Sequence, residues 1–312
     1  MIDKMSTKAM VKEPVKFSHY AGAMGVFLRT STSGIVRSVP ERPKELGGRR
    51  GIFDLNIFVF ESLRTVLDMD GYSPNSYIAM ETFSKYITRI DDIMDSVKHP
   101  RMSEWNSSYK KDPNAKQIIS MFVKHIKSME KGAIINKNQA TELFNAVHSY
   151  RKRARIAIER FENLNNPDIT DILLIKRITT GGMGAIMADI VCICESVPES
   201  KRNIITGAFS DAFMATQIAD DINDLNDDIK NNVPNIAAAI IQQIHIDESS
   251  VLEMEKMDIK TFRRRAPKSY NDLMRLGGEY ISLIPKEPFG LGVLRAIPVV
   301  FYNIISLTSR SD

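Results

Sequence analysis

The chain has 312 residues, 43% of them hydrophobic and 26% charged, so it is long enough to bury a sizeable core as one domain or as two. Its formal net charge is +4 and its pI is near 8.9. This mild basicity fits a phosphorylated small molecule, a nucleic acid or a membrane surface as partner, so charge alone selects none of them.

The composition argues against a secreted or membrane-spanning protein. The longest apolar runs are shorter than the roughly 18 residues of a spanning helix, and no signal-peptide pattern follows Met1. Cys192 and Cys194 are too close for a structural disulfide and have no Cys or His cluster to complete a zinc site. We therefore expect a soluble cytoplasmic protein with reduced thiols. The first 50 residues hold ten Lys or Arg against four Asp or Glu, so an organelle transit segment is the alternative there.

The hydrophobic periodicity predicts an all-α protein. Residues 1–51 carry scattered small and basic residues and end in the loop signal SVPERPKELGGRRG. Beyond them, apolar positions recur at 3.6-residue spacing over 53–67, 74–96, 115–129 and 138–161, through the 170s to 190s, over 205–231 and towards the C-terminus. The sequence predicts a partly irregular N-terminal extension, 1–51, and one helical bundle, 52–312, around a central cavity. Either a monomer or a homodimer is compatible with this pattern.

An acidic run, QIADDINDLNDDIKNN, lies at 217–232 on one predicted helix. At 100° per residue, Asp220, Asp224 and Asp227 fall within about 60° of one another, opposite a face of isoleucine and leucine. A solvated face would stay polar along the helix, but this stripe becomes apolar towards its start. We expect its earlier residues to line a cavity with carboxylates at the rim. These lining residues are Phe209, Phe213, Thr216 and Gln217.

A second acidic cluster has the same design. Asp91 and Asp95 share a helix face at i, i+4, and Asp92 lies one step round, in a DDxxD pattern. Acidic pairs near helix ends are common, so this pattern alone is a weak signal. Two helices that both pass from an uncharged stripe to carboxylates are harder to explain as solvated faces. The stripe that precedes the first cluster comprises Tyr77, Met80, Ser84, Ile87 and Thr88.

Carboxylates gathered at a cavity rim repel one another unless cations lie between them. Oxygen ligands without His or Cys select Mg²⁺, with Mn²⁺ as the alternative, and Mg²⁺ is commonly shared with substrate phosphates. The implied ligand has a diphosphate at the rim and an apolar body in the cavity. Such a site allows an allylic C–O bond to ionise in an apolar, water-excluded space.

These residues resemble the class I isoprenoid (terpenoid) synthase superfamily, whose all-α fold holds two Asp-rich motifs across a pocket. The resemblance covers about 75–235 and, more loosely, the chain to 310. Both acidic motifs are similar to those of trans-prenyl diphosphate synthases, and GGRR at 47–50 resembles their substrate loop. The arginine pair that follows the first motif in that family is absent here, where only Arg101 is near.

Two other branches of the superfamily compete with this resemblance. Gln217, Asp224 and Asp228 match the second motif of squalene and phytoene synthases, and residues 275–305 are similar to their closing helices. Terpene cyclases are matched by NDLNDDIKN, in which Asp227 replaces a serine and Asn231 a glutamate. On this resemblance the metal ligands are Asp91, Asp92, Asp95, Asp220, Asn223, Asp224, Asp227, Asp228 and Asn231.

The cyclase resemblance also assigns a diphosphate sensor. Arg177 lies 46 residues before Asn223, a separation like that of the cyclases' sensing arginine, and Gly181 follows where their helix breaks. Lys230 comes directly after the second motif and is a further diphosphate-binding candidate. A cyclase is expected to point Arg177 into the pocket, whereas an Arg177 exposed to solvent favours a prenyltransferase.

The leading hypothesis is a Mg²⁺-dependent terpene synthase that ionises one prenyl diphosphate and cyclises or rearranges the carbocation. The alternative is a prenyltransferase that joins the cation to a second substrate, and a non-catalytic interaction protein on the same fold ranks third. No nucleic acid partner is expected. The basic run SYRKRARIAIER, 149–160, is read as a solvated helix face, and the apolar C-terminal segment as a core helix, with peripheral membrane contact as the alternative.

Overall fold

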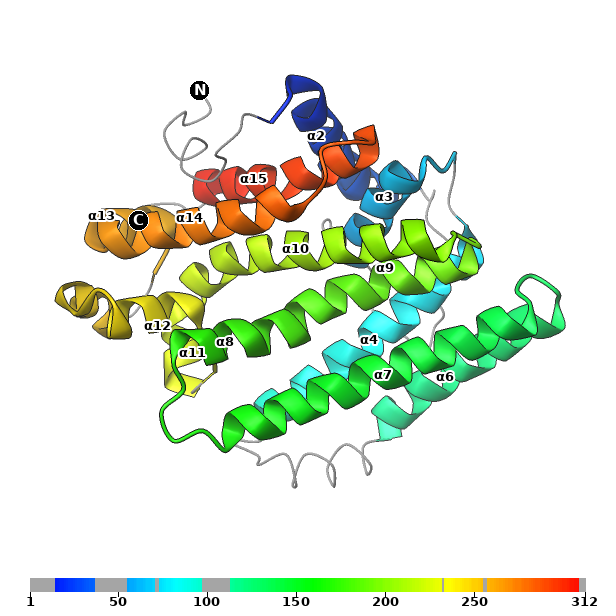
Figure 1. Ribbon diagram of the computed structural model, residues 1–312, viewed down its shortest axis with the longest axis horizontal. Helices are drawn as coiled ribbons and strands as arrows, with labels where there is room; N and C mark the ends of the chain where they lie inside the picture. The colour runs from blue at the N-terminus through cyan, green and yellow to red at the C-terminus, as the bar shows by residue number, and fades with distance from the viewer. Residues whose placement is uncertain are drawn as a thin grey trace. The chain divides into compact units, whose positions relative to one another are not determined.

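The computed structural model describes residues 15–36, 55–70, 73–96, 113–231, 233–254 and 257–308, with only the backbone described at 31–36, 55, 89–96, 114–115 and 304–308. All regular structure in these ranges is helical, which confirms the predicted fold class (Figure 1). The elements are α2 (Phe17–Val36), α3 (Leu55–Leu67), α4 (Pro74–Ser96), α6 (Pro113–Lys131), α7 (Lys137–Glu162), α8 (Ile169–Lys176), η2 (Arg177–Gly181), α9 (Gly182–Cys194), α10 (Glu199–Asn223), α11 (Leu225–Asn231), α12 (Ile236–Gln243), η3 (Ile246–Glu253), α13 (Ile259–Arg265), α14 (Pro267–Leu283) and α15 (Phe289–Thr308).

Contacts divide the chain into two compact units, neither of which is one continuous stretch. Unit 1 comprises Met1–Ala23, Asn163–Gly182 and Gly207–Asp312, and unit 2 comprises Met24–Glu162 and Met183–Thr206. The predicted boundary at residue 51 lies outside the described residues. Helix α2 falls within the predicted N-terminal extension, and its ends are held by Lys16–Glu287 (2.7 Å) in unit 1 and Arg29–Glu61 (2.8 Å) in unit 2. This part of the extension is therefore packed against the rest of the chain.

The C-terminal helix α15 forms the centre of unit 1. Residues 290–300 are all buried, and Val299 packs with Ala215 of α10 and Ile281 of α14. A Cβ atom at Gly292 would lie 2.3 Å from the ring of His19, so glycine is needed where α15 approaches the start of α2. The prediction that this apolar segment is a core helix is confirmed.

A buried carboxylate in unit 1 fixes the start of α14. Glu248, on η3, accepts hydrogen bonds from the backbone amides of Lys268 (2.8 Å) and Ser269 (2.9 Å) and from the Ser269 hydroxyl (2.6 Å). Burial alone would raise the pKa of Glu248, but these hydrogen bonds outweigh it and leave the pKa below its ordinary value. Glu248 therefore supplies the cap that α14 lacks at its own N-terminus, where Pro267 follows Ala266.

In unit 2, α4 packs against α3 and α6, and α6 packs against α7. Tyr86 of α4 is fully buried among Ile118, Ile119 and Ile158 from the two later helices. Helix α7 begins with a capping box: Asn136 Oδ1 accepts from the amide of Gln139, and Gln139 Oε1 accepts from the amide of Asn136. Amphipathic spacing and this cap place α7 where the sequence predicts it.

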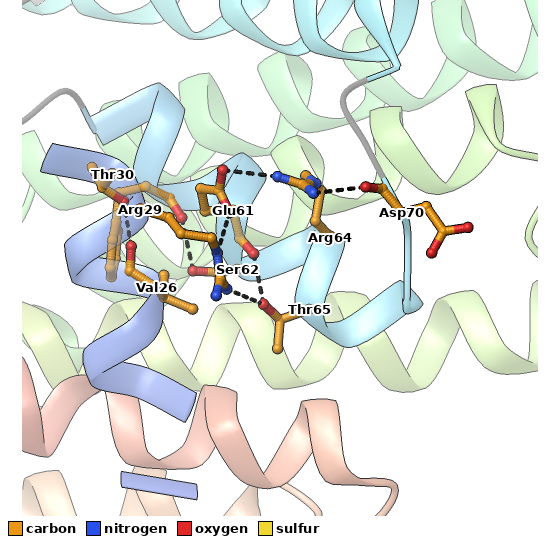
Figure 2. Close-up of polar contacts among 9 residues, drawn as sticks. Val26, Arg29, Thr30, Glu61, Ser62, Arg64, Thr65 and Asp70 are labelled. Atoms are coloured by element: carbon orange, nitrogen blue, oxygen red, sulfur yellow. Dashed lines mark hydrogen bonds and ion pairs between the residues drawn. The ribbon is translucent and has the colours of Figure 1, made fainter. Parts of the chain in front are cut away.

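Figure 2 shows an ion-pair network between α2 and α3 of unit 2, centred on the buried carboxylate of Glu61. Glu61 is 1% exposed and accepts from Arg29 Nε at 2.8 Å and Arg64 Nη1 at 3.0 Å. Arg29 also donates to the hydroxyl of Thr65 (2.9 Å), and Arg64 donates to the carbonyl oxygen of Asp70. Because two guanidinium groups surround one carboxylate, this buried negative charge is more than matched by nearby positive charge.

One described helix, Ile169–Cys194, is long and apolar enough by composition to cross a membrane, and half of its most apolar window is buried inside the protein. The expectation that no apolar run reaches the length of a spanning helix did not include this segment, because Lys176 and Arg177 interrupt it. Both of these side chains form ion pairs within the protein, Lys176 with Asp221 and Arg177 with Asp211. Cys192 and Cys194 on this helix are free, and burial raises the pKa of each to about 12, so neither is a reactive thiolate.

Candidate active site

The end of α10 positions the second acidic cluster in unit 1. The predicted single helix over 205–231 is two helices, α10 and α11, with a bend at Asp224 across which helical hydrogen bonding continues. Asp220, Asp224 and Asp227 are exposed, while Ile222 and Leu225 are buried, so the two predicted faces are present. The remaining predicted ligands and the lysine lie close by: Asn223 and Asp228 are half-buried, and Lys230 and Asn231 are exposed.

Several carboxylates of this cluster have pKa values above the ordinary value of an aspartate. The protein around Asp220 and the charges of Asp224 and Asp221 raise the pKa of Asp220 to about 6, even though its side chain remains exposed. Removal from solvent raises the pKa of Asp228 to about 6, despite a hydrogen bond from Asn235 Nδ2 at 2.8 Å. The pKa of Asp224 is raised too, by its surroundings and then by Asp221 and Asp227. The cluster thus holds more negative charge than the neighbouring cation neutralises.

Asp221, which the sequence analysis did not select, is fully buried at the centre of this region. It accepts hydrogen bonds from Lys176 Nζ (3.1 Å), from Gln217 Nε2 (2.6 Å) and from the backbone amide of Ile236 (2.6 Å). Gln217 also donates to Asp220 at 3.1 Å. Asp221 therefore joins the end of α10 to α8 and to the first turn of α12.

Of two neighbouring cations, Lys176 is the one that lies at the acidic cluster. Arg177 instead pairs with Asp211 and lies 5.6 Å from the ring centroid of Tyr280, with its side chain 38% exposed. Asp211 precedes Asp220 by nine residues, about 13 Å along a helix at 1.5 Å per residue. The assignment of Arg177 to diphosphate stays a prediction. Consecutive helical residues point about 100° apart, so only the folded structure shows which of Lys176 and Arg177 faces the acidic cluster.

The chain widens into a π-helical turn, η2, directly after Lys176. The amide of Gly182 donates to the carbonyl oxygen of Arg177, five residues earlier. A Cβ atom at Gly181 would lie 2.9 Å from Ser210 Oγ and 3.2 Å from Met214 Cγ on α10. Gly181 is thus required by the close approach of η2 to α10, and the helix predicted to break there is widened instead.

Asn235 closes the region behind the carboxylates. Its Oδ1 accepts from the amide of Ala238 and caps α12, while its Nδ2 donates to the Asp221 carbonyl oxygen and to Asp228. An asparagine directly before the apolar run IAAAII is a helix-start signal that the sequence offered. Asn226, by contrast, is buried with neither side-chain polar atom hydrogen-bonded to any described residue.

The first acidic cluster is only partly described. The backbone places Asp91, Asp92 and Asp95 in the last turns of α4, and their side chains lie outside the described residues. Earlier on the helix, Tyr77, Met80 and Ser84 are buried, Ile87 is half-buried and Thr88 is exposed. On α10, Phe209 is buried, and Phe213, Thr216 and Gln217 are half-buried. The two stripes belong to different units, so a shared pocket between them stays a prediction.

Unit 2 has an open hollow of about 420 Å³ between α4 and α6, on another side of α4. It is reached by Ile78 and Thr82, which point roughly 100° or more from Tyr77 and Ser84 on the helix. Thr82, Gln117, Ser120 and Lys124 give it a mixed polar lining. It therefore does not correspond to the apolar stripe predicted to line the active-site cavity.

The donors at the α10–α11 bend suit Mg²⁺ chemically. Within the described ranges, no group of three His, Cys, Asp or Glu side chains converges as a metal site. Asp220 and Asp224, one helical turn apart, offer a pair of exposed carboxylates. Mg²⁺ usually takes one or two protein carboxylates and completes its shell with water and substrate phosphate, so two carboxylates fit this ion.

Comparisons with protein-family profiles and with curated proteins find no match. Among solved structures, the geranylgeranyl pyrophosphate synthetase from the archaeon Geoglobus acetivorans is 15% identical and aligns over 96% of this chain and 99% of its own, with a TM-score of 0.52. The geranylgeranyl pyrophosphate synthetase from Pyrococcus horikoshii Ot3 is 14% identical and aligns over 99% and 95%, with a TM-score of 0.57. At these identities the likeness concerns the fold, and the chain has the all-α isoprenoid synthase fold.

Proposed function

We propose that this protein is a Mg²⁺-dependent prenyltransferase that joins the allylic cation of one prenyl diphosphate to a second substrate. The observation that carries the proposal is the cluster at the α10–α11 bend. There the carboxylates of Asp220, Asp224 and Asp228 have raised pKa values and lie near Lys176, at the end of a largely apolar helix face. Its support is the fold shared with two proteins described as geranylgeranyl pyrophosphate synthetases.

Residue roles follow from charge and position. Asp220, Asp224, Asp227 and Asp228, with Asn223 and Asn231, are proposed oxygen ligands, and Asp91, Asp92 and Asp95 are proposed to act as a second set. Mg²⁺, when bound, supplies positive charge that stabilises the departing diphosphate. Lys176 is proposed to hold a phosphate oxygen, with Lys230 and Arg177 as further candidates. The apolar stripes on α4 and α10 are proposed to keep water from the cation.

The prenyltransferase is favoured over the terpene synthase that led the sequence hypotheses. The cyclase hypothesis gave Arg177 the role of binding the diphosphate, and this side chain is 38% exposed and engaged by Asp211. In the proposed reaction, the allylic C–O bond breaks with its electrons leaving on diphosphate. The double bond of the second substrate then supplies the electron pair of the new carbon–carbon bond, and the resulting cation loses a proton to the departed diphosphate. Terpene cyclisation, which needs one substrate only, is the second candidate.

Incubation with C10, C15 and C20 prenyl diphosphates, singly and in pairs, tests the proposal when products are identified by mass spectrometry. Diphosphate release that requires two substrates and yields a joined chain is the expected result. Release from one substrate with a cyclic product would establish the cyclase instead, and no release from any combination would favour the interaction protein.

A matched pair of variants tests the assignment of Lys176. Lys176→Gln is expected to lower turnover about a hundredfold, because a charge-assisted contact to the leaving group is lost, and Arg177→Gln less than tenfold. Equal losses, or the reverse order, would return the diphosphate-binding role to Arg177. Circular dichroism of both variants checks that the helices survive.

A further inference from the structure

Helices α6 and α7 of unit 2 carry a concentrated positive charge. Together with the turn between them they form the α6–α7 hairpin, residues 113–162. This segment contains ten Lys or Arg and four Asp or Glu, a net charge of +6, while the whole chain has only +4. The rest of the chain sums to −2 although residues 1–50 carry a like excess of +6, so the hairpin is a local concentration of positive charge that would attract an anionic partner.

The lysines of α6 share one solvent-facing side. Lys116, Lys124, Lys127 and Lys131 are all exposed. At 100° per residue they fall within an arc of about 80°. The opposite side of the helix, represented by Phe122, Ile126 and Met129, is buried. This distribution is that of an amphipathic helix with a cationic face rather than of charges scattered round the helix.

On α7 the exposed cations gather in the second half, where Lys152, Arg153, Arg155 and Arg160 face solvent. The hairpin's acidic side chains only partly offset them. Glu142 is paired with Arg202, which lies outside the hairpin, and Glu159 lies 3.7 Å from Arg155. Glu130 is half-buried and Glu162 exposed. A net positive field remains over the hairpin surface.

Exposed apolar side chains lie among these charges. Ile134, in the turn between the helices, is 53% exposed, and Ile156 on α7 is 47% exposed. Helix surfaces that lie on anionic lipid typically carry lysine and arginine around exposed apolar side chains. The cations face the lipid headgroups, and the apolar side chains enter the interface. A second copy of the same surface would be repelled by like charge.

We propose that the α6–α7 hairpin docks this protein on the anionic surface of a phospholipid bilayer. The choice of a bilayer over other polyanions rests on the proposed function, because a prenyl chain partitions into membranes. The contact is peripheral and electrostatic, so it weakens as salt shortens the Debye length from about 10 Å at 0.1 M to about 3 Å at 1 M.

Co-sedimentation of the full chain with vesicles tests the proposal. Vesicles of phosphatidylcholine alone are compared with vesicles containing phosphatidylserine, at 0.1 M and 1 M sodium chloride. We expect binding to the anionic vesicles only, with at least a tenfold loss at high salt. Equal binding to neutral vesicles would overturn the electrostatic assignment, and no binding at all would leave the hairpin as a solvated surface.

Two triple variants with the same change of charge locate the surface. Lys152→Gln, Arg153→Gln and Arg160→Gln on the hairpin should lower anionic-vesicle binding about tenfold or more. The control replaces Arg264, Arg265 and Lys286, which are exposed in unit 1, by Gln and should bind as the wild type does. Equal loss in both would show attraction by net charge only and would contradict a hairpin site.

Two further readouts separate this proposal from its competitors. Duplex DNA that displaces the protein from vesicles at lower concentration than soluble phosphoserine would point to nucleic acid and against the bilayer. Turnover of soluble prenyl diphosphates without vesicles should be unchanged in the hairpin variant. Vesicle binding by a protein that turns over no prenyl diphosphate would uphold the docking surface while the proposed function failed.

Discussion

Glu61 on α3 and Asp220 on α10 are both carboxylates on long helices, yet their surroundings are opposite. Glu61 is 1% exposed and is held by two guanidinium groups at 2.8 and 3.0 Å (Figure 2). Asp220 is exposed, accepts a hydrogen bond from the neutral amide of Gln217, and has its pKa raised to about 6 by its surroundings and by two neighbouring aspartates. Glu61 is thus neutralised by two arginines of the same unit, whereas the carboxylates at the bend carry more negative charge than Lys176 neutralises.

Asp221 shows that two aspartates of the same acidic run can have opposite surroundings. It is adjacent to Asp220 in sequence, but it is fully buried and accepts from a lysine, an amide side chain and a helix N-terminus. One turn of α10 thus carries a carboxylate that is hydrogen-bonded within the fold and another that we propose as a ligand of Mg²⁺. Replacing residues on each side of this division should therefore affect stability and activity separately.

The largest expected effect is on activity. Asp224→Ala should lower diphosphate release about 10²- to 10³-fold, because an exposed carboxylate proposed to bind Mg²⁺ is lost. Its melting temperature should stay within about 2 °C of the wild type, since no packed side chain is removed. Steady-state turnover and thermal unfolded fraction measure the two quantities. A destabilised Asp224→Ala variant with normal turnover would contradict the assignment of Asp224 to activity and not to stability.

The first acidic cluster should behave in the same way. Asp91→Ala combined with Asp95→Ala is expected to lower turnover about 10²-fold or more while the helical circular dichroism signal remains, because two proposed Mg²⁺ ligands are lost and alanine has a high helix propensity. The measurement is turnover at saturating Mg²⁺. Unchanged turnover would remove this cluster from the mechanism.

The next effect is on stability. Glu61→Gln keeps the side-chain volume but leaves Arg29 and Arg64 without their carboxylate, which should cost about 2–4 kcal/mol of unfolding free energy. Urea unfolding measures it. Glu279→Gln is the control: Glu279 pairs with Arg275 at 3.1 Å on the exposed surface, and its loss should cost less than about 0.5 kcal/mol. Similar losses in the two variants would mean that burial adds nothing to the Glu61 network.

A smaller, pH-dependent effect is expected at Glu248. Its pKa is lowered in the folded state, so its contribution is present above about pH 4.5 and is lost as pH falls through the folded pKa. Glu248→Gln should cost about 1–2 kcal/mol at pH 7. Once the pH has fallen below the folded pKa of Glu248, the variant and the wild type should unfold at nearly the same urea concentration. A difference that persists there would assign the effect to shape instead of charge.

The smallest effect has the opposite sign. Because the pKa of Asp220 is raised to about 6 in the folded state, folding binds a proton more tightly, and stability falls as pH rises from about 4 to 6. Asp220→Asn should raise the melting temperature by about 1–2 °C at pH 7, the exposed position and salt screening keeping the gain small. At pH 4 the two proteins should melt together. A lower melting temperature at pH 7 would contradict the unmatched charge.

The sequence predicts the helices and their faces because local spacing determines them. The buried Ile222 and Leu225 and the exposed Asp220, Asp224 and Asp227 all follow from the 3.6-residue period. The bend at Asp224 did not follow, because the same period continues through it. Apolar spacing likewise identified α15 as a core helix, although it gave no sign of the close approach between Gly292 and His19.

The sequence did not predict which charged side chains pair with one another. Lys176 meets Asp221 across 45 residues and Arg177 meets Asp211 across 34, and nothing local distinguishes these partners from their neighbours. A resemblance measured by separation along the chain selected Arg177, one residue from the cation that reaches the acidic cluster. In a helix that single step is a rotation of about 100°.

The π-helical turn η2 sets the direction in which the side chains of Lys176 and Arg177 point. A turn closed by a five-residue hydrogen bond contains one residue more than an α-helical turn, so α8 enters it rotated relative to an uninterrupted helix. Deleting one residue from Thr179–Thr180 would restore the regular helix and swing Lys176 away from Asp221. The length of this turn therefore decides whether the side chain at 176 or the side chain at 177 faces Asp221, so a one-residue change in η2 would alter the side chain presented to the acidic cluster without any substitution.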